Sequence, residues 1–199
     1  ATASTTYTEP FNLVRQFASL DHISKGRVGW NIVTSWSEPA SRNYGYETQI
    51  SHEERYRRAD EFMEVATGLW DSWSDNAITD DKQKGQFLHD EGVRSINHKG
   101  QFYSVSGPLN ISRGPQGRPV LVQAGSSDTG RRFAAQHAEA VFTAHMQKET
   151  AKAFYSDLKG LVKNTGRRQD QCLILPGLSP VIASTETEAK RYSEDLNNL

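Results

Sequence analysis

The segment VLVQAGSSDTGRRFAA, residues 120–135, contains the clearest candidate binding loop of the chain. An apolar strand pattern leads through a glycine, Ser126 and Ser127 into a helical pattern that carries Arg131. Backbone N–H groups at a helix N-terminus bind anions, above all phosphate, and serine hydroxyls and an arginine would add to such a site. A second interpretation is that Ser127 or Asp128 only caps a crossover helix, and the loop taken alone favours this simpler cap.

A second candidate is the pair His52 and Tyr56, at the start of a long predicted helix. Ser51, followed three residues later by Glu54, has the capping-box pattern that begins a helix. The four-residue spacing places His52 and Tyr56 on one helix face, where their polar rings could bind an anion or a flat polar ligand. A solvated helix start is the simpler interpretation of this pair alone. The motif resembles the zinc sequence His-Glu-x-x-His, but tyrosine replaces the second histidine, so we expect no metal site.

Polar residues also interrupt or follow predicted strands. Asn31 and Ser35 belong to the apolar run GWNIVTSW, and His145 follows a later strand. In parallel α/β sheets, side chains at the carboxyl ends of strands face the ligand crevice. A buried asparagine can equally be structural, so Asn31 has two open interpretations.

The elements that must position these residues alternate between strand and helix patterns. The sequence predicts strands over 27–34, 119–124, 140–144 and near 171–183, and helices over 10–26, from 52, near 128–138, near 147–163 and from 185. This alternation predicts a parallel sheet with helices outside, so the fold class is α/β. Residues 75–118 form an irregular excursion with short antiparallel strands near 98–107. The acidic residues of the long helix and its continuation are predicted to form a solvated face.

Composition bounds the possible functions. The chain has 199 residues, enough for one domain with a sizeable core, and a formal net charge of -1. We therefore expect no nucleic-acid partner, and without an apolar run of about 20 residues we expect no membrane span. The single cysteine, Cys172, lies in an apolar stretch and is predicted to be a core residue. The chain opens on a strand-like segment and stops inside a helical pattern, so we expect an internal piece of a longer protein.

Taken in order, several motifs carry a specific resemblance over nearly the whole chain. They are SLDHISKGRVGWNIVTS (19–35), RNYG (42–45), HEERY (52–56), LWDSW (69–73), HKGQFYSVSGPLN (98–110) and GRPVLVQAGSS (117–127). The chain resembles the nitrilotriacetate and dibenzothiophene-sulfone monooxygenase branch of the bacterial luciferase-like flavoproteins. Long-chain alkane monooxygenase belongs to the same branch.

The resemblance implies a (β/α)8 TIM barrel, of which residues 1–199 are an internal part with an insertion at about 75–118. It also implies FMN at the carboxyl-terminal mouth of the barrel, with Ser126 and Ser127 at the phosphate. The predicted flavin-binding residues are Thr2, Ser4, Asn31, His52, Tyr56, Ser126 and Ser127, and His52 and Tyr56 are also the predicted catalytic residues.

The implied activity is that of a cytoplasmic, homo-oligomeric two-component monooxygenase. A separate NAD(P)H:flavin reductase would supply reduced FMN, which with O2 would oxygenate a small organic substrate. Trp36 would belong to a lid or substrate wall, and His145 departs from the glutamine expected at its position. The alternatives are a non-catalytic flavin-binding protein of the same superfamily and a relative that uses the deazaflavin F420.

Overall fold

A parallel sheet of five strands organises the chain. In the computed structural model, which describes residues 1–198, the strand order is β1-β2-β7-β8-β9. The strands are β1 (Thr2–Ser4), β2 (Gly29–Val33), β7 (Val120–Gln123), β8 (Ala140–Thr143) and β9 (Leu173–Pro176). All four neighbouring pairs are parallel, and Thr2 lies opposite Asn31, which in turn lies opposite Val122. The predicted α/β class is confirmed.

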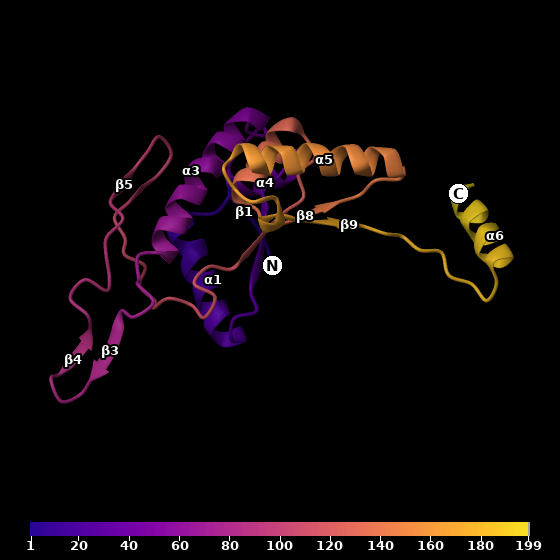
Figure 1. The fold of residues 1–199 in the computed structure, drawn as a ribbon. Helices are drawn as coiled ribbons and strands as arrows, with labels where there is room; N and C mark the ends of the chain where they lie inside the picture. Colours follow the sequence, from indigo (N-terminus) through magenta and orange to yellow (C-terminus); the bar gives the residue numbers. More distant parts are fainter. Residues whose placement is uncertain (199) are drawn as a thin grey trace.

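Four helices cover one face of this sheet (Figure 1). They are α1 (Pro10–Ser24), α3 (His52–Trp70), α4 (Asp128–His137) and α5 (Lys148–Asn164). They pack in a row, α1 on α3, α3 on α4 and α4 on α5. Short elements connect them: α2 (Glu38–Ser41) and two 3-10 turns, η1 (Arg42–Tyr44) and η2 (Gln169–Gln171). The last helix, α6 (Glu186–Asn197), lies apart at the end of an extended segment, and none of its described residues is buried (Figure 1).

Local side-chain caps explain where three of these helices begin. The Ser51 side chain accepts a hydrogen bond from the backbone N–H of Glu54 at α3, and Thr185 does the same for α6. Ser127 caps α4 by accepting from the N–H of Gly130. Each cap satisfies one of the N–H groups that a helix start leaves without a partner, and all three helix starts agree with the predicted ones.

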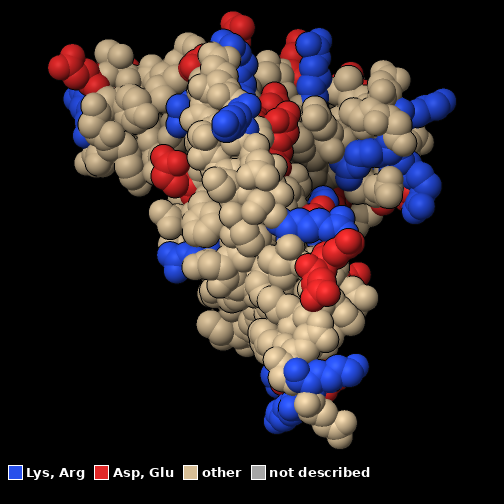
Figure 2. Space-filling model, turned by 90° about the vertical axis from the view of Figure 1, so that its left-hand side faces the viewer, with Lys and Arg blue, Asp and Glu red and all other residues tan. Residues whose placement is uncertain are grey.

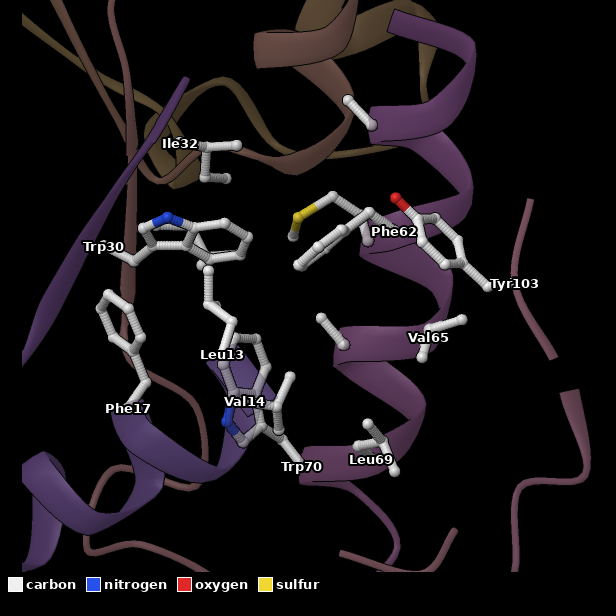
Figure 3. Packing of buried hydrophobic residues seen from close by; sticks show 14 of the residues in the cluster. Leu13, Val14, Phe17, Trp30, Ile32, Phe62, Val65, Leu69, Trp70 and Tyr103 are labelled. Atoms are coloured by element: carbon white, nitrogen blue, oxygen red, sulfur yellow. The ribbon is translucent and has the colours of Figure 1, made fainter. Parts of the chain in front are cut away.

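Trp30 of β2 lies at the centre of the main core, between α1 and α3 (Figure 3). Its ring centroid is 5.7 Å from that of Phe17, 5.8 Å from that of Phe62 and 6.2 Å from that of Trp70. Burying a large apolar side chain of this kind stabilises the fold by about 1.5–3 kcal/mol. Because strand side chains alternate, the burial of Trp30 against the helices places Asn31 on the opposite face of the sheet.

That opposite face has no helical cover within the described residues. Val120, Phe142 and Leu173 lie on it and remain roughly half exposed. The described strands therefore form an open sheet and not a closed barrel.

A second, smaller core joins α4, α5 and β8 around Ala134, Val141 and Leu158. Cys172 is fully buried in it, as predicted, and burial raises the pKa of its thiol. A buried, protonated thiol behaves as a small apolar group.

The excursion at 75–118 is more ordered than the sequence predicts. It contains the predicted pair β5 (His98–Lys99) and β6 (Ser104–Val105), and also an unpredicted hairpin of β3 (Ile78–Asp81) and β4 (Gln86–Leu88). Both hairpins project away from the sheet; the β5–β6 hairpin runs beside α3, and the β3–β4 hairpin lies farther out (Figure 1).

Glu61 of α3 anchors the β5–β6 hairpin. Its carboxylate accepts hydrogen bonds from the backbone N–H groups of Phe102 (2.9 Å) and Tyr103 (2.8 Å), and His98 Nε2 lies 3.1 Å away. Glu61 is 9% exposed. The prediction of a wholly solvated acidic face is therefore wrong at this residue, because the excursion folds back onto the helix.

The last predicted strand, near 171–183, is also shorter in the structure. β9 ends at Pro176, and Pro180 follows four residues later. The backbone N–H of Gly177 still donates to the carbonyl of Thr143 (2.7 Å), and Pro180, which has no N–H to donate, interrupts the segment three residues later.

Charged side chains of both signs are interspersed over the face drawn in Figure 2. Such a surface fits the formal net charge of -1 and carries no extended field of one sign. No helix within residues 1–198 is both long enough and apolar enough to cross a membrane.

Candidate functional site

A hollow of about 520 Å³ lies at the carboxyl ends of β2 and β7, against the first turns of α3. This is the end of a parallel sheet at which ligands bind in α/β folds. The lining residues come from three segments: residues 32–37 with Ala40, the helix residues His52, Arg55 and Tyr56, and residues 123–125.

His52 and Tyr56 meet the β7–α4 loop at one side of this hollow. Their ring centroids are 4.9 Å apart, and His52 Nε2 lies 3.4 Å from Ser127 Oγ. The N-terminal turns of α3 and α4 are thereby brought together. Ser127 is also the cap of α4, and the two interpretations of this loop are compatible: the hydroxyl oxygen accepts from the N–H of Gly130, and its hydrogen can point either to His52 Nε2 or to a ligand.

The loop passes closely over Tyr56, and two glycines face its hydroxyl group. A methyl group at Gly125 would lie 3.0 Å from the Tyr56 hydroxyl, and one at Gly130 would lie 2.9 Å from it. The Tyr56 ring packs edge-on against Phe133 of α4, with centroids 5.7 Å apart. The hydroxyl group of Tyr56 is thus held beside the loop backbone.

Arg131 does not supply free positive charge to the loop. Its guanidinium donates to Asp128 (2.7 Å), to Asp157 (2.6 Å) and to the carbonyl of Ser126 (2.6 Å). The hydrogen bond to Asp157, more than any other contact, raises the pKa of Arg131. The Ser126 side chain is exposed, while its carbonyl is tied to this ion-pair network.

Thr2, Ser4 and Asn31 form a separate group along β1 and β2. Asn31 Nδ2 donates to Thr2 Oγ1 (3.2 Å), while Asn31 Oδ1 is buried with no partner among the described residues. Ser4 Oγ accepts from Ser35 Oγ (2.8 Å), and Ser35 lines the hollow. The structure therefore connects Ser4 to the hollow through Ser35, but Thr2 and Asn31 do not line it.

Trp36 and His145 occupy different environments. Trp36 lines the hollow with its side chain 86% exposed. The His145 ring packs on Phe154 of α5, 5.2 Å between centroids, and does not line the hollow.

Arg55 is the charged lining residue that the sequence analysis missed, and the buried Gln123 is a missed polar one. Arg55 is only 7% exposed, and its Nη1 donates to the backbone carbonyl of Ile50. Its position three residues after His52 on the same helix face was the available signal.

A larger hollow, of about 790 Å³, opens near the start of β7, at the opposite end of the sheet. Its charges compensate one another: Asp71 binds both Arg113 (3.1 Å) and Arg118, and Arg113 also binds Asp75 (2.6 Å). The amino-terminal end of a barrel sheet contributes to stability, so we place the candidate site at the smaller hollow.

A model of the luciferase-like monooxygenase family matches residues 1–198. The chain belongs to this family. It is 49% identical over its whole length to N-acetyl-S-(2-succino)cysteine monooxygenase of Bacillus subtilis, covering 45% of that protein. It is 48% identical, again over its whole length, to nitrilotriacetate monooxygenase component A of Aminobacter aminovorans, covering 44% of it. The predicted branch is confirmed.

A solved luciferase-like structure gives the same result for the fold. Riboflavin lyase, described with modified FMN and substrate riboflavin, superposes with a TM-score of 0.91 at 38% identity, over 98% of this chain and 44% of that one. The chain thus spans about half the length of the curated relatives that it matches. Its open sheet and outer helices are part of the luciferase-like TIM-barrel architecture, as predicted.

Proposed function

We propose that the protein carrying this chain is an FMN-dependent two-component monooxygenase that oxygenates a small organic substrate. The observation that carries the proposal is the meeting of His52, Tyr56 and Ser127 beside a hollow at the carboxyl ends of the strands. The names of the two similar monooxygenases support the reaction class. A flavin reductase would be the partner, the cytoplasm the location and a homo-oligomer the assembly.

The residues present fit FMN. The phosphate needs hydrogen-bond donors, which the Ser127 hydroxyl and the first N–H groups of α4 offer, with His52 Nε2 donating to Ser127 Oγ to orient it. The flavin ring needs surrounding side chains without negative charge, and among the described lining residues none is Asp or Glu. When bound, reduced FMN supplies the electrons that activate O2.

Each side chain has a distinct task in this proposal. Ser127 and Ser126 would bind the phosphate, and the Tyr56 hydroxyl, which lies beside the loop backbone, would donate a hydrogen bond to the cofactor. His52 orients Ser127 and, with Tyr56, is the proposed catalytic pair. Trp36, which is 86% exposed in the described chain, would fold over the bound ligand and exclude water from the reacting atoms. In this proposal the cofactor extends beyond the hollow along the open face of β1 and β2, where Thr2, Ser4 and Asn31 would contact it.

Removing the Ser127 hydroxyl tests the cofactor site. A charge-assisted hydrogen bond contributes about 1.5–3 kcal/mol, so Ser127→Ala should weaken FMN binding by about 10- to 100-fold in a fluorescence titration. Riboflavin, which lacks the phosphate, should bind almost equally to both proteins. Thr185→Ala is a matched control, because it removes a cap of the same kind from α6.

If Ser127→Ala weakened the binding of FMN and riboflavin equally, Ser127 would be only a helix cap and not a phosphate-binding residue. Substrate-dependent O2 consumption with FMN, a reductase and NADH separates a monooxygenase from a non-catalytic flavin binder or an F420-dependent relative.

A further inference from the structure

Arg55 carries a buried positive charge that the chain does not neutralise. Arg55 is the fourth residue of α3, at the end of its first turn, and it is 7% exposed. Within residues 1–198 it forms no ion pair, and its Nε is buried without any hydrogen-bond partner. Its one hydrogen bond goes to the Ile50 carbonyl, a neutral acceptor. Burying an unpaired guanidinium is costly, so a counter-charge from outside the described chain would relieve it.

The other described residues that line the hollow do not supply that counter-charge. Arg55 lines the hollow, and none of the other described lining residues is Asp, Glu, Lys or Arg. The carboxylates nearest in sequence, Glu53 and Glu54, do not line it, and Glu54 pairs with exposed Arg57 at 3.3 Å. The single permanent charge of this hollow is therefore positive, in an environment where water is partly excluded and electrostatic attraction is strengthened.

Arg55 is distinct from the Ser127 loop. The hydroxyl group of Tyr56, the next residue of the helix, lies close to where side chains at Gly125 and Gly130 of that loop would be. Arg55 instead contacts Ile50, in the segment that precedes α3. Successive side chains of a helix point about 100° apart, so the side chains of Arg55 and Tyr56 point toward different parts of the hollow.

We propose that Arg55 is an anion-binding residue, whose guanidinium pairs with a carboxylate or phosphate group of a ligand in this hollow. This inference rests on the proposed function in one respect: the anionic group would belong either to the substrate or to the cofactor of that function. A guanidinium offers several N–H donors in one plane and binds both kinds of oxyanion through two parallel hydrogen bonds. The substrate would then be an organic acid, or the cofactor phosphate would extend to Arg55.

Ligand pairs that differ only in charge test this inference on the full-length protein. Calorimetric titration compares succinate with neutral succinamide, and FMN with riboflavin, on the wild type and on Arg55→Gln. We expect Arg55→Gln to weaken binding of one anionic member by about 10- to 100-fold and to leave its neutral counterpart unchanged. A loss for succinate identifies a carboxylate, and a loss for FMN identifies the phosphate.

Two further variants separate binding from structure. Arg57→Gln makes the same charge change on the exposed face of α3 and should leave all four affinities unchanged. Arg55→Lys keeps the charge and should restore part of the lost anion affinity. Equal weakening of charged and neutral ligands, or unchanged affinity for both anions, would overturn the proposal. Absence of FMN binding to the wild type would refute the proposed function, while the succinate comparison would still decide the role of Arg55.

Discussion

Two buried charged residues on helix α3 differ in whether the rest of the chain supplies hydrogen-bond partners for their charge. Arg55 and Glu61 lie six residues apart and are 7% and 9% exposed. Glu61 is surrounded by donors from its own chain, whereas Arg55 has one neutral acceptor and a bare Nε. A charge that the fold neutralises contributes to structure, and one that it leaves unpaired is available to a ligand. The same helix therefore combines an anchoring segment with a binding segment.

The anchor tolerates little change around Glu61. A side chain at Gly100 would collide with the Glu61 carboxylate, so the β5–β6 turn requires glycine there. Burial would raise the pKa of Glu61, but the hydrogen bonds from His98, Phe102 and Tyr103 hold it below its ordinary value. The ionised form is the one that the hairpin binds.

Removing the anchor should give the largest effect. Glu61→Ala leaves two backbone N–H groups and His98 without their acceptor, so we expect the free energy of unfolding to fall by about 3 kcal/mol. Urea denaturation measures this value. Glu64→Ala, on the exposed side of the same helix, should change it by no more than about 0.5 kcal/mol. Similar values for the two variants would contradict the anchoring role.

Acid should weaken the same anchor without a mutation. Because the folded-state pKa of Glu61 is lowered, its stabilisation is complete above the ordinary value of 4.5 and is lost as the pH falls through the folded-state pKa. Wild-type protein should therefore lose more stability than Glu61→Gln between about pH 5 and about pH 3. Parallel urea titrations over this range provide the comparison, and identical pH profiles would exclude Glu61 as the titrating group.

The smallest effect is expected at the binding end of the helix. Tyr56→Phe removes only a hydroxyl group and keeps the ring contact with Phe133. One hydrogen bond contributes about 1 kcal/mol, so FMN affinity should fall about 5-fold while the urea midpoint stays the same. Unchanged affinity and unchanged oxygenation would leave Tyr56 as a packing residue.

The contrast between these residues shows what the sequence could predict. Helix starts at Ser51 and Ser127 depend on hydrogen bonds three residues away, so local patterns were enough. The environment of Glu61 depends on Phe102 and Tyr103, more than forty positions along the chain, and helical periodicity cannot report such contacts.

Arg55 was missed for the same physical reason. A charged residue between two polar rings is typical of an exposed first turn, and only the approach of residues 32–37 and 123–125 buries it. The prediction that His52 and Tyr56 share one helix face required only the geometry of a helix, and the structure confirms it.

The cap at Ser127 has a thermodynamic consequence for ligand capture. The N–H of Gly130 (3.1 Å) and His52 Nε2 (3.4 Å) fix the rotamer of this serine before any ligand arrives. The entropy of ordering the side chain is lost during folding and does not oppose association. A ligand at Ser127 would also bind only the folded chain, so it would raise the unfolding free energy by about 2.7 kcal/mol at a hundred times its Kd.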